Sequence, residues 1–252
     1  MSVLVLGDVH GQYEQLKSFY NYKNKDYSAV IVCGDYGIWN DVFFKEGELV
    51  LPDRYKIELG CPIYFCDGNH ENHNTLDRFE RGKIHKLCDN VNFCAYGSHL
   101  SLEGKEYLFL GGASSIDKLN RVEGESWWRT EVITEEDNTF IDYTIKYDYV
   151  ISHTAPTSVC REMSGTFSTH QGKFIDPSTY YLEEVLSKIK HPKLNWIYGH
   201  WHVHKKYKIA DVQFNGLNML PISRNTFTEN YWNQFDEFTA LHCHSNIFYC
   251  EV

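Results

Sequence analysis

The chain has 252 residues, of which 42% are hydrophobic, so it is long enough to bury a substantial core as one large domain or two small ones. It carries 24 Lys and Arg residues against 34 Asp and Glu residues, a formal net charge of −10. Because duplex binding depends on clustered positive charge, this balance disfavours long nucleic acid as a partner and leaves a small phosphorylated molecule as the compatible one.

The cysteine content and the hydropathy of the sequence indicate the cellular compartment of the protein. The eight cysteines include no CxxC pair, and a chain of this length does not need disulfides, so we expect reduced thiols. No apolar run approaches the roughly 20 residues of a membrane helix, and the short apolar stretch at 3–6 is followed at once by Asp8. We therefore expect a cytoplasmic protein with no membrane partner, while the oligomeric state is not indicated.

Short runs of β-branched or aromatic residues predict buried strands. In chain order they are Val3–Leu6, Ala29–Cys33, Pro62–Cys66, Tyr107–Leu110, Tyr149–Ser152 and Trp196–Tyr198. Each of these runs leads directly into glycine, aspartate or histidine. Polar side chains therefore gather where the strands end.

Helix patterns lie between the strands. The spacing predicts helices at Tyr13–Asn21, Thr75–Arg81 and Ser178–Lys190, the last with Ser178 as its N-cap. Strands that alternate with helices indicate an α/β fold, whereas Tyr207–Val252 is typical of strands and hairpins, so the sheets are expected to be mixed.

No repeat and no linker composition marks a domain boundary. We expect a single domain over residues 1–252. The polar, acidic segment 117–142 contains a Trp127-Trp128 pair and is predicted to be a long excursion over one rim of the sheet, where such loops often shape access to a site.

Clusters of potential metal ligands follow five strand ends. They are Gly7-Asp8-Val9-His10-Gly11, Gly34-Asp35-Tyr36-Gly37, Gly68-Asn69-His70-Glu71, Ser152-His153 and Gly199-His200-Trp201-His202. Alternate residues of an extended segment point the same way, so Asp8 and His10 can reach one ion. Oxygen and imidazole donors without thiolate favour Mn, Fe or Zn in a catalytic site over a structural zinc site.

The succession GDVHG, GDYG, GNHE, SH and GHWH, between residues 7 and 202, resembles the calcineurin-like metallophosphoesterase superfamily. The resemblance implies two mixed β-sheets packed face to face and flanked by helices, a four-layer αββα sandwich. It implies a hydrolase of phosphate esters with two divalent metal ions, Mn foremost with Fe or Zn as alternatives. Metals about 3.5–4 Å apart can share and activate a water, so the implied nucleophile is a metal-bridging hydroxide.

The resemblance also implies a role for each matching residue. One ion is expected to be bound by Asp8, His10 and His202, and the other by Asn69, His153 and His200. Asp35 is expected to bridge the two ions. His70 is not a ligand in the family's pattern and is left to stabilise the transition state or protonate the leaving oxygen, with a hydrogen-bonded scaffold role as the alternative. Glu71 is expected to support the ligands from behind, or to be purely structural.

Two arginines of the phosphoprotein phosphatase pattern, GDxVDRG and RGNHE, are missing here. Ile38 and Trp39 stand at the aspartate and arginine positions of the first motif, and Asp67 replaces the arginine of the second. Because guanidinium groups grip the free oxygens of a phosphate, their loss favours a phosphodiester or nucleotide-type substrate over a phosphoprotein monoester.

Candidate substrate contacts are Trp39, His73, Arg121 and Trp201. Tryptophans beside the metals can stack a nucleobase, although rim packing explains them too. Three other functions stay open: a phosphomonoesterase including a phosphoprotein phosphatase, a metal-binding scaffold without catalysis, and a metal-dependent nuclease, which the acidic charge disfavours. His242 and His244 alternate on a predicted strand and are interpreted as an ordinary polar strand face.

Overall fold

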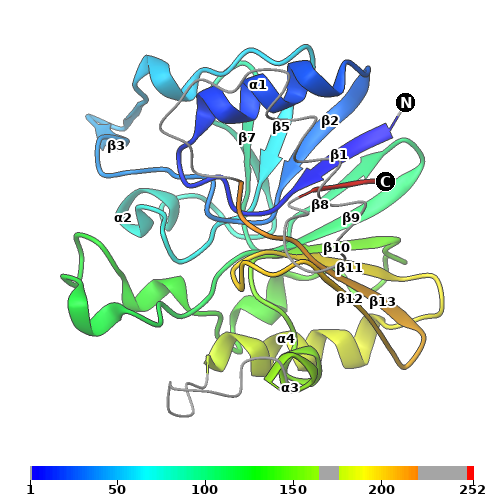
Figure 1. The fold of residues 1–252 in the computed structure, drawn as a ribbon. Coiled ribbons are helices and arrows are strands. Elements are labelled where there is room, and N and C mark those ends of the chain that lie inside the picture. The colour runs from blue at the N-terminus through cyan, green and yellow to red at the C-terminus, as the bar shows by residue number, and fades with distance from the viewer. Residues whose placement is uncertain (1, 165–175, 221–248) are drawn as a thin grey trace.

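Two six-stranded sheets form the centre of the computed structural model, which describes residues 2–164, 176–220 and 249–252 (Figure 1). The first sheet has the strand order β14-β1-β2-β5-β7-β6, made of β1 (Ser2–Leu6), β2 (Tyr27–Val32), β5 (Ile63–Phe65), β6 (Ile84–Lys86), β7 (Val91–Cys94) and β14 (Tyr249–Glu251). The second has the order β12-β13-β11-β10-β9-β8, made of β8 (His99–Leu102), β9 (Lys105–Leu110), β10 (Tyr149–Ser152), β11 (Asn195–Tyr198), β12 (Lys205–Ile209) and β13 (Val212–Gly216).

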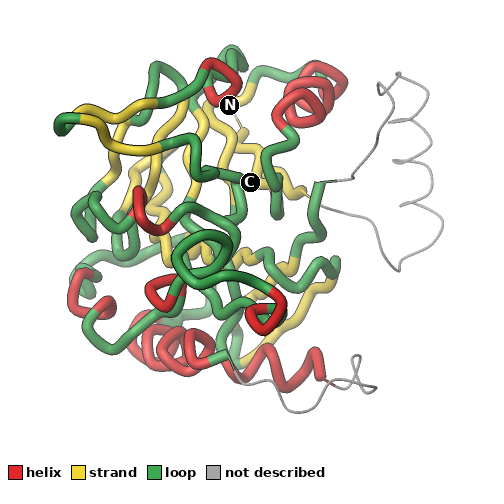
Figure 2. The backbone as a smooth tube through the Cα atoms, turned by 90° about the vertical axis from the view of Figure 1, so that its left-hand side faces the viewer, coloured by secondary structure: helices red, strands yellow, loops and turns green. Residues whose placement is uncertain are grey.

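Both sheets are mixed in the same way. The central strands of each run parallel, and each edge strand pairs antiparallel with its neighbour. Parallel strands bring their carboxyl ends to one edge of a sheet, which is where ligands bind in open α/β sheets. The residues that follow β1, β2, β5, β10 and β11 are therefore brought to one side of the molecule. Figure 2 faces that side and shows loops lying in front of the strands.

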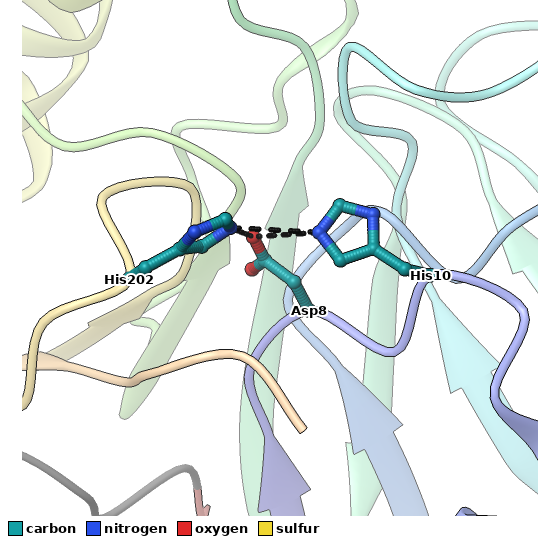
Figure 3. A group of neighbouring side chains, drawn as sticks. All are labelled: Asp8, His10 and His202. Atoms are coloured by element: carbon teal, nitrogen blue, oxygen red, sulfur yellow. Dashed lines mark hydrogen bonds and ion pairs between the residues drawn. The ribbon is translucent and has the colours of Figure 1, made fainter. Parts of the chain in front are cut away.

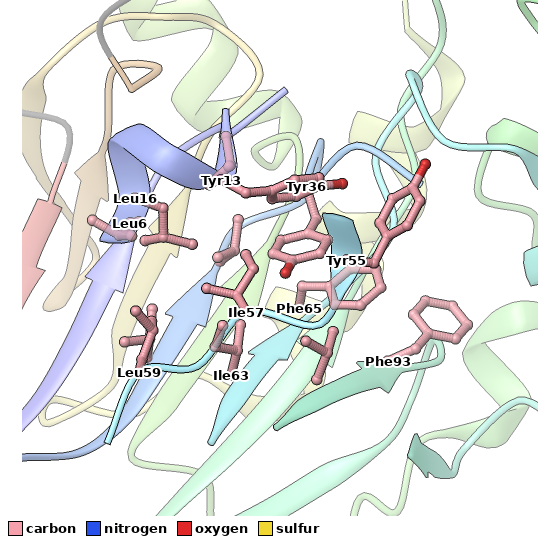
Figure 4. Packing of buried hydrophobic residues seen from close by; sticks show 14 of the residues in the cluster. Leu6, Tyr13, Leu16, Tyr36, Tyr55, Ile57, Leu59, Ile63, Phe65 and Phe93 are labelled. Atoms are coloured by element: carbon pink, nitrogen blue, oxygen red, sulfur yellow. The ribbon is translucent and has the colours of Figure 1, made fainter. Parts of the chain in front are cut away.

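Three apolar clusters separate four layers. On β1, Leu4 and Leu6 pack toward helix α1 (Tyr13–Lys23), whereas Val3 and Val5 pack between the sheets. A strand buried on both faces must be apolar throughout, as β1 is. The outer cluster of the first sheet is rich in aromatic rings, with Tyr36 stacked on Phe65 at a centroid distance of 4.6 Å (Figure 4).

Helices α3 (Thr157–Ser164) and α4 (Pro177–Ile189) cover the outer face of the second sheet, and Leu182 and Val185 of α4 belong to the same buried cluster as Trp196 of β11. The order is thus α1, first sheet, second sheet, α3 with α4. This confirms the predicted α/β fold of two mixed sheets flanked by helices. Within the described residues, no helix is long and apolar enough to cross a membrane.

All three predicted helices differ from the prediction in their bounds. Helix α1 ends at Lys23 instead of Asn21. Helix α2 spans only His73–Leu76, because the next hydrogen bonds, from the Arg78 and Phe79 amides, reach back three residues instead of four. The N-cap of α4 is Asp176, whose carboxylate accepts from the Ser178 amide at 2.9 Å, and Pro177 takes the first helical position.

Irregular segments complete the chain. A small hairpin pairs β3 (Phe43–Lys45) with β4 (Glu48–Val50), and a 3-10 turn, η1 (Asp53–Tyr55), follows. The rim segment 117–142 holds the turns η2 (Lys118–Asn120), η3 (Arg129–Glu131) and η4 (Asp137–Phe140) and no longer element. Of the region predicted to form strands and hairpins, β12, β13 and β14 are observed, whereas His242 and His244 lie outside the described residues.

Candidate metal centre

Seven potential metal ligands from both sheets come together where their strands end. Asp8, Asp35 and Asn69 follow strands of the first sheet, His153 and His200 follow strands of the second, and His10 and His202 lie beside them. Distances between neighbouring donor atoms run from 2.9 to 3.8 Å. All seven residues that the sequence singled out as ligands are therefore neighbours.

Asp8 divides its two carboxylate oxygens between the backbone and the imidazoles. Its Oδ1 accepts from the His200 amide at 3.0 Å, and its Oδ2 lies 2.9 Å from His202 Nε2 and 3.8 Å from His10 Nε2. Figure 3 shows this group, with both rings turned toward the carboxylate. The amide thus orients the carboxylate so that one oxygen is available to an ion.

Asp35 is oriented in the same way as Asp8, with one oxygen on a backbone amide and the other toward histidine rings. Its Oδ1 accepts from the His70 amide at 2.9 Å, and its Oδ2 lies 3.4 Å from His153 Nε2 and 3.8 Å from His10 Nε2. Burial alone raises the pKa of this carboxyl, but His153 and His70 hold it well below its usual range. Asp35 is therefore an anion that faces imidazoles on two sides.

Asn69 is oriented by a residue that the sequence analysis did not single out. Its Oδ1 lies 3.0 Å from both His153 Nε2 and His200 Nδ1, while its Nδ2 donates to Ser115 Oγ at 3.2 Å. The donation to Ser115 fixes which end of the amide faces the histidines. The available signal was Gly111 to Ser115, a small and polar run directly after β9, like the runs after the ligand-bearing strands.

His153 presents its Nε2 to the site. Its Nδ1 lies 2.8 Å from the Cys33 carbonyl, which can only accept, so Nδ1 carries the proton and Nε2 is the ligand atom. Burial favours the neutral ring, but the Asp35 carboxylate beside it raises the pKa of His153 to about 10. In His200, by contrast, burial and the neighbouring His153 lower the pKa to about 3, so this ring is neutral.

The backbone around these side chains is built to fit them closely. A Cβ atom added to Gly34, Gly68 or Gly199 would lie within 2.3 Å of a ligand side chain. Left-handed φ angles occur at the non-glycine ligands His10, Asp35, His200 and His202, at 51°, 47°, 64° and 50°. Such strained conformations cluster at functional sites.

Two sets of three donors are compact enough to hold an ion. Within each set, one donor atom per residue lies within 4.8 Å of the others: Asp8, His10 and His202 in one, and Asp8, Asp35 and His153 in the other. The hard oxygen and imidazole donors suit divalent metals. The first set is the one that the resemblance implies. The second set contains Asp35 and His153 as implied, but its third member is Asp8, and Asn69 and His200 lie next to it.

Glu71 ties two of the ligand loops together. Its Oε1 accepts from the Gly37 amide at 3.0 Å and its Oε2 from the Gly68 amide at 2.7 Å. Burial, followed by the nearby Asp35 charge, raises the pKa of Glu71 to about 8. The side chain contacts backbone and not the ligand atoms, as a supporting residue would.

The four candidate substrate contacts lie in different surroundings. Trp39 and Arg121 line a pocket beside His70. Trp201 packs edge-on against His200 at 5.1 Å and donates through Nε1 to Thr154 Oγ1 at 3.1 Å.

His73 differs from the expectation that it lines the substrate side. The side chain is fully buried, and its Nε2 lies 2.9 Å from the Gly68 carbonyl while its Nδ1 lies 3.4 Å from Asp77. Because the helix begins at His73, two residues earlier than predicted, the ring turns inward under the Gly68 loop and is closed off from solvent.

Paired mixed sheets with carboxylate, amide and imidazole donors at their strand ends define a metal-dependent α/β hydrolase class. Residues 1–204 match the family model of calcineurin-like phosphoesterases. The chain therefore belongs to the calcineurin-like phosphoesterase family, which makes it a metal-dependent phosphoesterase and confirms the resemblance seen in the sequence.

No curated protein matches the chain. Among solved structures, it is similar to GAP50, the anchor in the inner membrane complex of Plasmodium, with 14% identity, a TM-score of 0.47, and coverage of 90% of this chain and 74% of the other. It is also similar to a conserved uncharacterized protein of Streptococcus pneumoniae described as a predicted phosphoesterase, with 11% identity, a TM-score of 0.34, and coverage of 90% and 76%.

Proposed function

We propose that the protein is a binuclear metallohydrolase of small phosphodiesters, with nucleotide-type esters preferred over phosphomonoesters. The observation that carries the proposal is the convergence of seven oxygen and imidazole donors around two adjacent three-residue sets that share Asp8. Two divalent ions, Mn foremost and Fe or Zn as alternatives, would supply Lewis acidity and a water acidic enough to attack phosphorus near neutral pH.

The residues of the chain have separate tasks in this proposal. Asp8, His10 and His202 would hold one ion and Asn69, His153 and His200 the other, with Asp35 available to both. His70 lies beside this group, with its amide on Asp35 and its ring at the pocket, and there it holds the proton for the leaving oxygen. Burial lowers the pKa of His70 and the Asp35 carboxylate partly offsets this, so the protonated ring that can donate is the minority form near neutral pH.

The preference for diesters rests on charge. Trp39 and Asp67 stand at the two arginine positions of the phosphoprotein phosphatase pattern, so neither position offers a guanidinium to a phosphate dianion. A diester monoanion needs fewer cations.

The seven described cysteines are all free thiols, which suits the reducing cytoplasm.

The test is hydrolysis of bis(p-nitrophenyl) phosphate and p-nitrophenyl phosphate by metal-stripped protein resupplied with Mn. We expect turnover only with metal, and a higher kcat/KM for the diester. A higher kcat/KM for the monoester would reverse the substrate preference, and metal binding without turnover of either ester would favour the inactive scaffold.

A further inference from the structure

A pocket of about 500 Å³ opens beside the metal centre, between the loop that follows β2 and the rim segment 117–142. Trp39, His70, Arg121, Glu125, Ser126 and Trp128 are among the residues that line it. The volume lies in the range of sites for small organic ligands and exceeds what a single phosphate needs. The pocket therefore has room for the organic part of an ester.

The rim segment is fastened over the site at its tip. Asn40 Nδ2 donates to the Glu125 carbonyl at 2.8 Å, and Asn74 Nδ2 donates to the Gly124 carbonyl at 3.0 Å. Asn40 follows the Asp35 loop, and Asn74 lies in α2, just after the Asn69 loop. The segment that carries Arg121 is thus held by both neighbouring ligand loops.

Arg121 reaches from this segment to His70. Its Nη2 lies 2.9 Å from Nε2 and 3.0 Å from Nδ1 of the His70 ring, and its side chain is only 13% exposed. Among the described residues, its oxygen partners are Asp117 Oδ2 at 2.8 Å and the Ser126 carbonyl at 3.1 Å. A guanidinium has five N–H donors, so donors remain for an anionic oxygen placed next to His70.

The two arginines that line the pocket are both paired with carboxylates. Arg54 pairs with Asp41 at 2.7 Å, and Arg121 pairs with Asp117 at 2.8 Å. A second phosphate in the pocket would therefore meet no uncompensated cation. The indole of Trp39 and the buried Trp128 add aromatic walls, and planar bases stack well on such rings.

We propose that this pocket holds the leaving group of the ester and takes an uncharged nucleoside, with Arg121 at its mouth binding a phosphoryl oxygen. The inference rests on the proposed function, because it places the leaving group next to His70. Arg121 thereby offers one guanidinium from the rim segment. The phosphoprotein phosphatase pattern has two, at the positions that Trp39 and Asp67 occupy here.

The pocket is tested by binding of adenosine to the metal-free protein, measured calorimetrically. We expect Trp39→Leu to weaken binding roughly 5- to 100-fold, the range for loss of base stacking. Trp127→Leu is the matched control, since Trp127 is a tryptophan of the rim segment that is not among the residues lining the pocket and contacts Lys118 instead. Absence of adenosine binding by the wild type, or equal weakening in both variants, would overturn the proposal. Mn binding by each variant checks that the site has folded.

Arg121 is tested by turnover of bis(p-nitrophenyl) phosphate. Arg121→Ala is expected to lower kcat/KM about 10- to 100-fold, as for loss of a hydrogen bond to a charged group. Arg129→Ala should change it less than twofold, because the Arg129 side chain is 79% exposed and pairs with Glu123. Equal effects of the two substitutions would refute the role of Arg121. If the wild type hydrolyses no ester, the proposed function fails, and adenosine binding still decides the pocket.

Discussion

Asp8 and Asp35 each give one carboxylate oxygen to a backbone amide and turn the other toward histidine rings. An amide side chain at either position keeps an acceptor for the backbone while removing the negative charge. Asparagine variants therefore separate the role of the charge from the role of the fold.

His70 gives a prediction that depends on the leaving group. His70→Gln should lower kcat by about 10²- to 10⁴-fold for an alkyl phosphodiester, the usual contribution of a general acid. The loss should be much smaller for a p-nitrophenyl ester, whose phenolate leaves without a proton. Steady-state rates on both esters check this, and an equal loss on both would assign His70 to another task.

The raised pKa of His153 predicts how metal affinity depends on pH. Below about pH 10 the His153 ring of the metal-free protein is doubly protonated, and an ion must displace the proton on Nε2. Affinity for Mn should consequently rise with pH, by roughly tenfold per pH unit for each proton released. Titrations of metal-free protein with Mn at pH 6.5 and 7.5 measure the slope. An affinity that does not change with pH would mean that the ion displaces no proton from His153.

At the scale of elements, the strands were predictable and the helices less so. Val3–Leu6 is apolar on both faces, and that continuous run identifies a strand between two layers. The helix at His73–Leu76 has no such pattern, because its start depends on Asn72, whose Nδ2 donates to the Val42 carbonyl 30 residues away. Contacts of that kind are invisible in a local sequence.

The candidate site divides in the same way. Its ligands follow strands, most of them in glycine-containing motifs, so order and spacing were enough to indicate them. Arg121 was a candidate substrate contact and Ser115 lies in a small polar run after a strand, but nothing in the sequence linked Arg121 to His70 or Ser115 to Asn69. Tertiary folding alone brings them there. That residues 1–252 form a single domain stays a prediction.

Glu71 predicts a stability effect at the junction of two loops. Glu71→Gln replaces one of two acceptor oxygens with an amide group that opposes a backbone N–H, so we expect a loss of about 1–3 kcal/mol in the free energy of unfolding. Urea denaturation in the presence of a chelator measures it without a contribution from metal. Glu80→Gln, at an exposed side chain, is the control and should stay within about 0.5 kcal/mol. Similar losses in the two variants would contradict the linking role of Glu71.

At the scale of the whole molecule, the metal centre joins the two sheets. Asp8, Asp35 and Asn69 come from the first sheet, and His153 and His200 from the second. An ion bound only by the native state stabilises it by about 2.7 kcal/mol at a hundredfold excess over Kd. For a chain of this size, that corresponds to a rise in Tm of about 5–10 °C. Calorimetry with Mn and with chelator measures the difference, and an unchanged Tm would show that no ion is held between the sheets.

The most direct test of the central claim is to count the metal ions bound by the protein and by Asp35→Asn while following bis(p-nitrophenyl) phosphate hydrolysis. We predict two Mn ions per wild-type chain, with activity that appears as the sites fill. In Asp35→Asn we predict loss of at least one ion and a fall in kcat/KM of more than about a hundredfold. Hydrolysis that persists in metal-free protein, or an Asp35→Asn variant with full occupancy and full activity, would contradict the account.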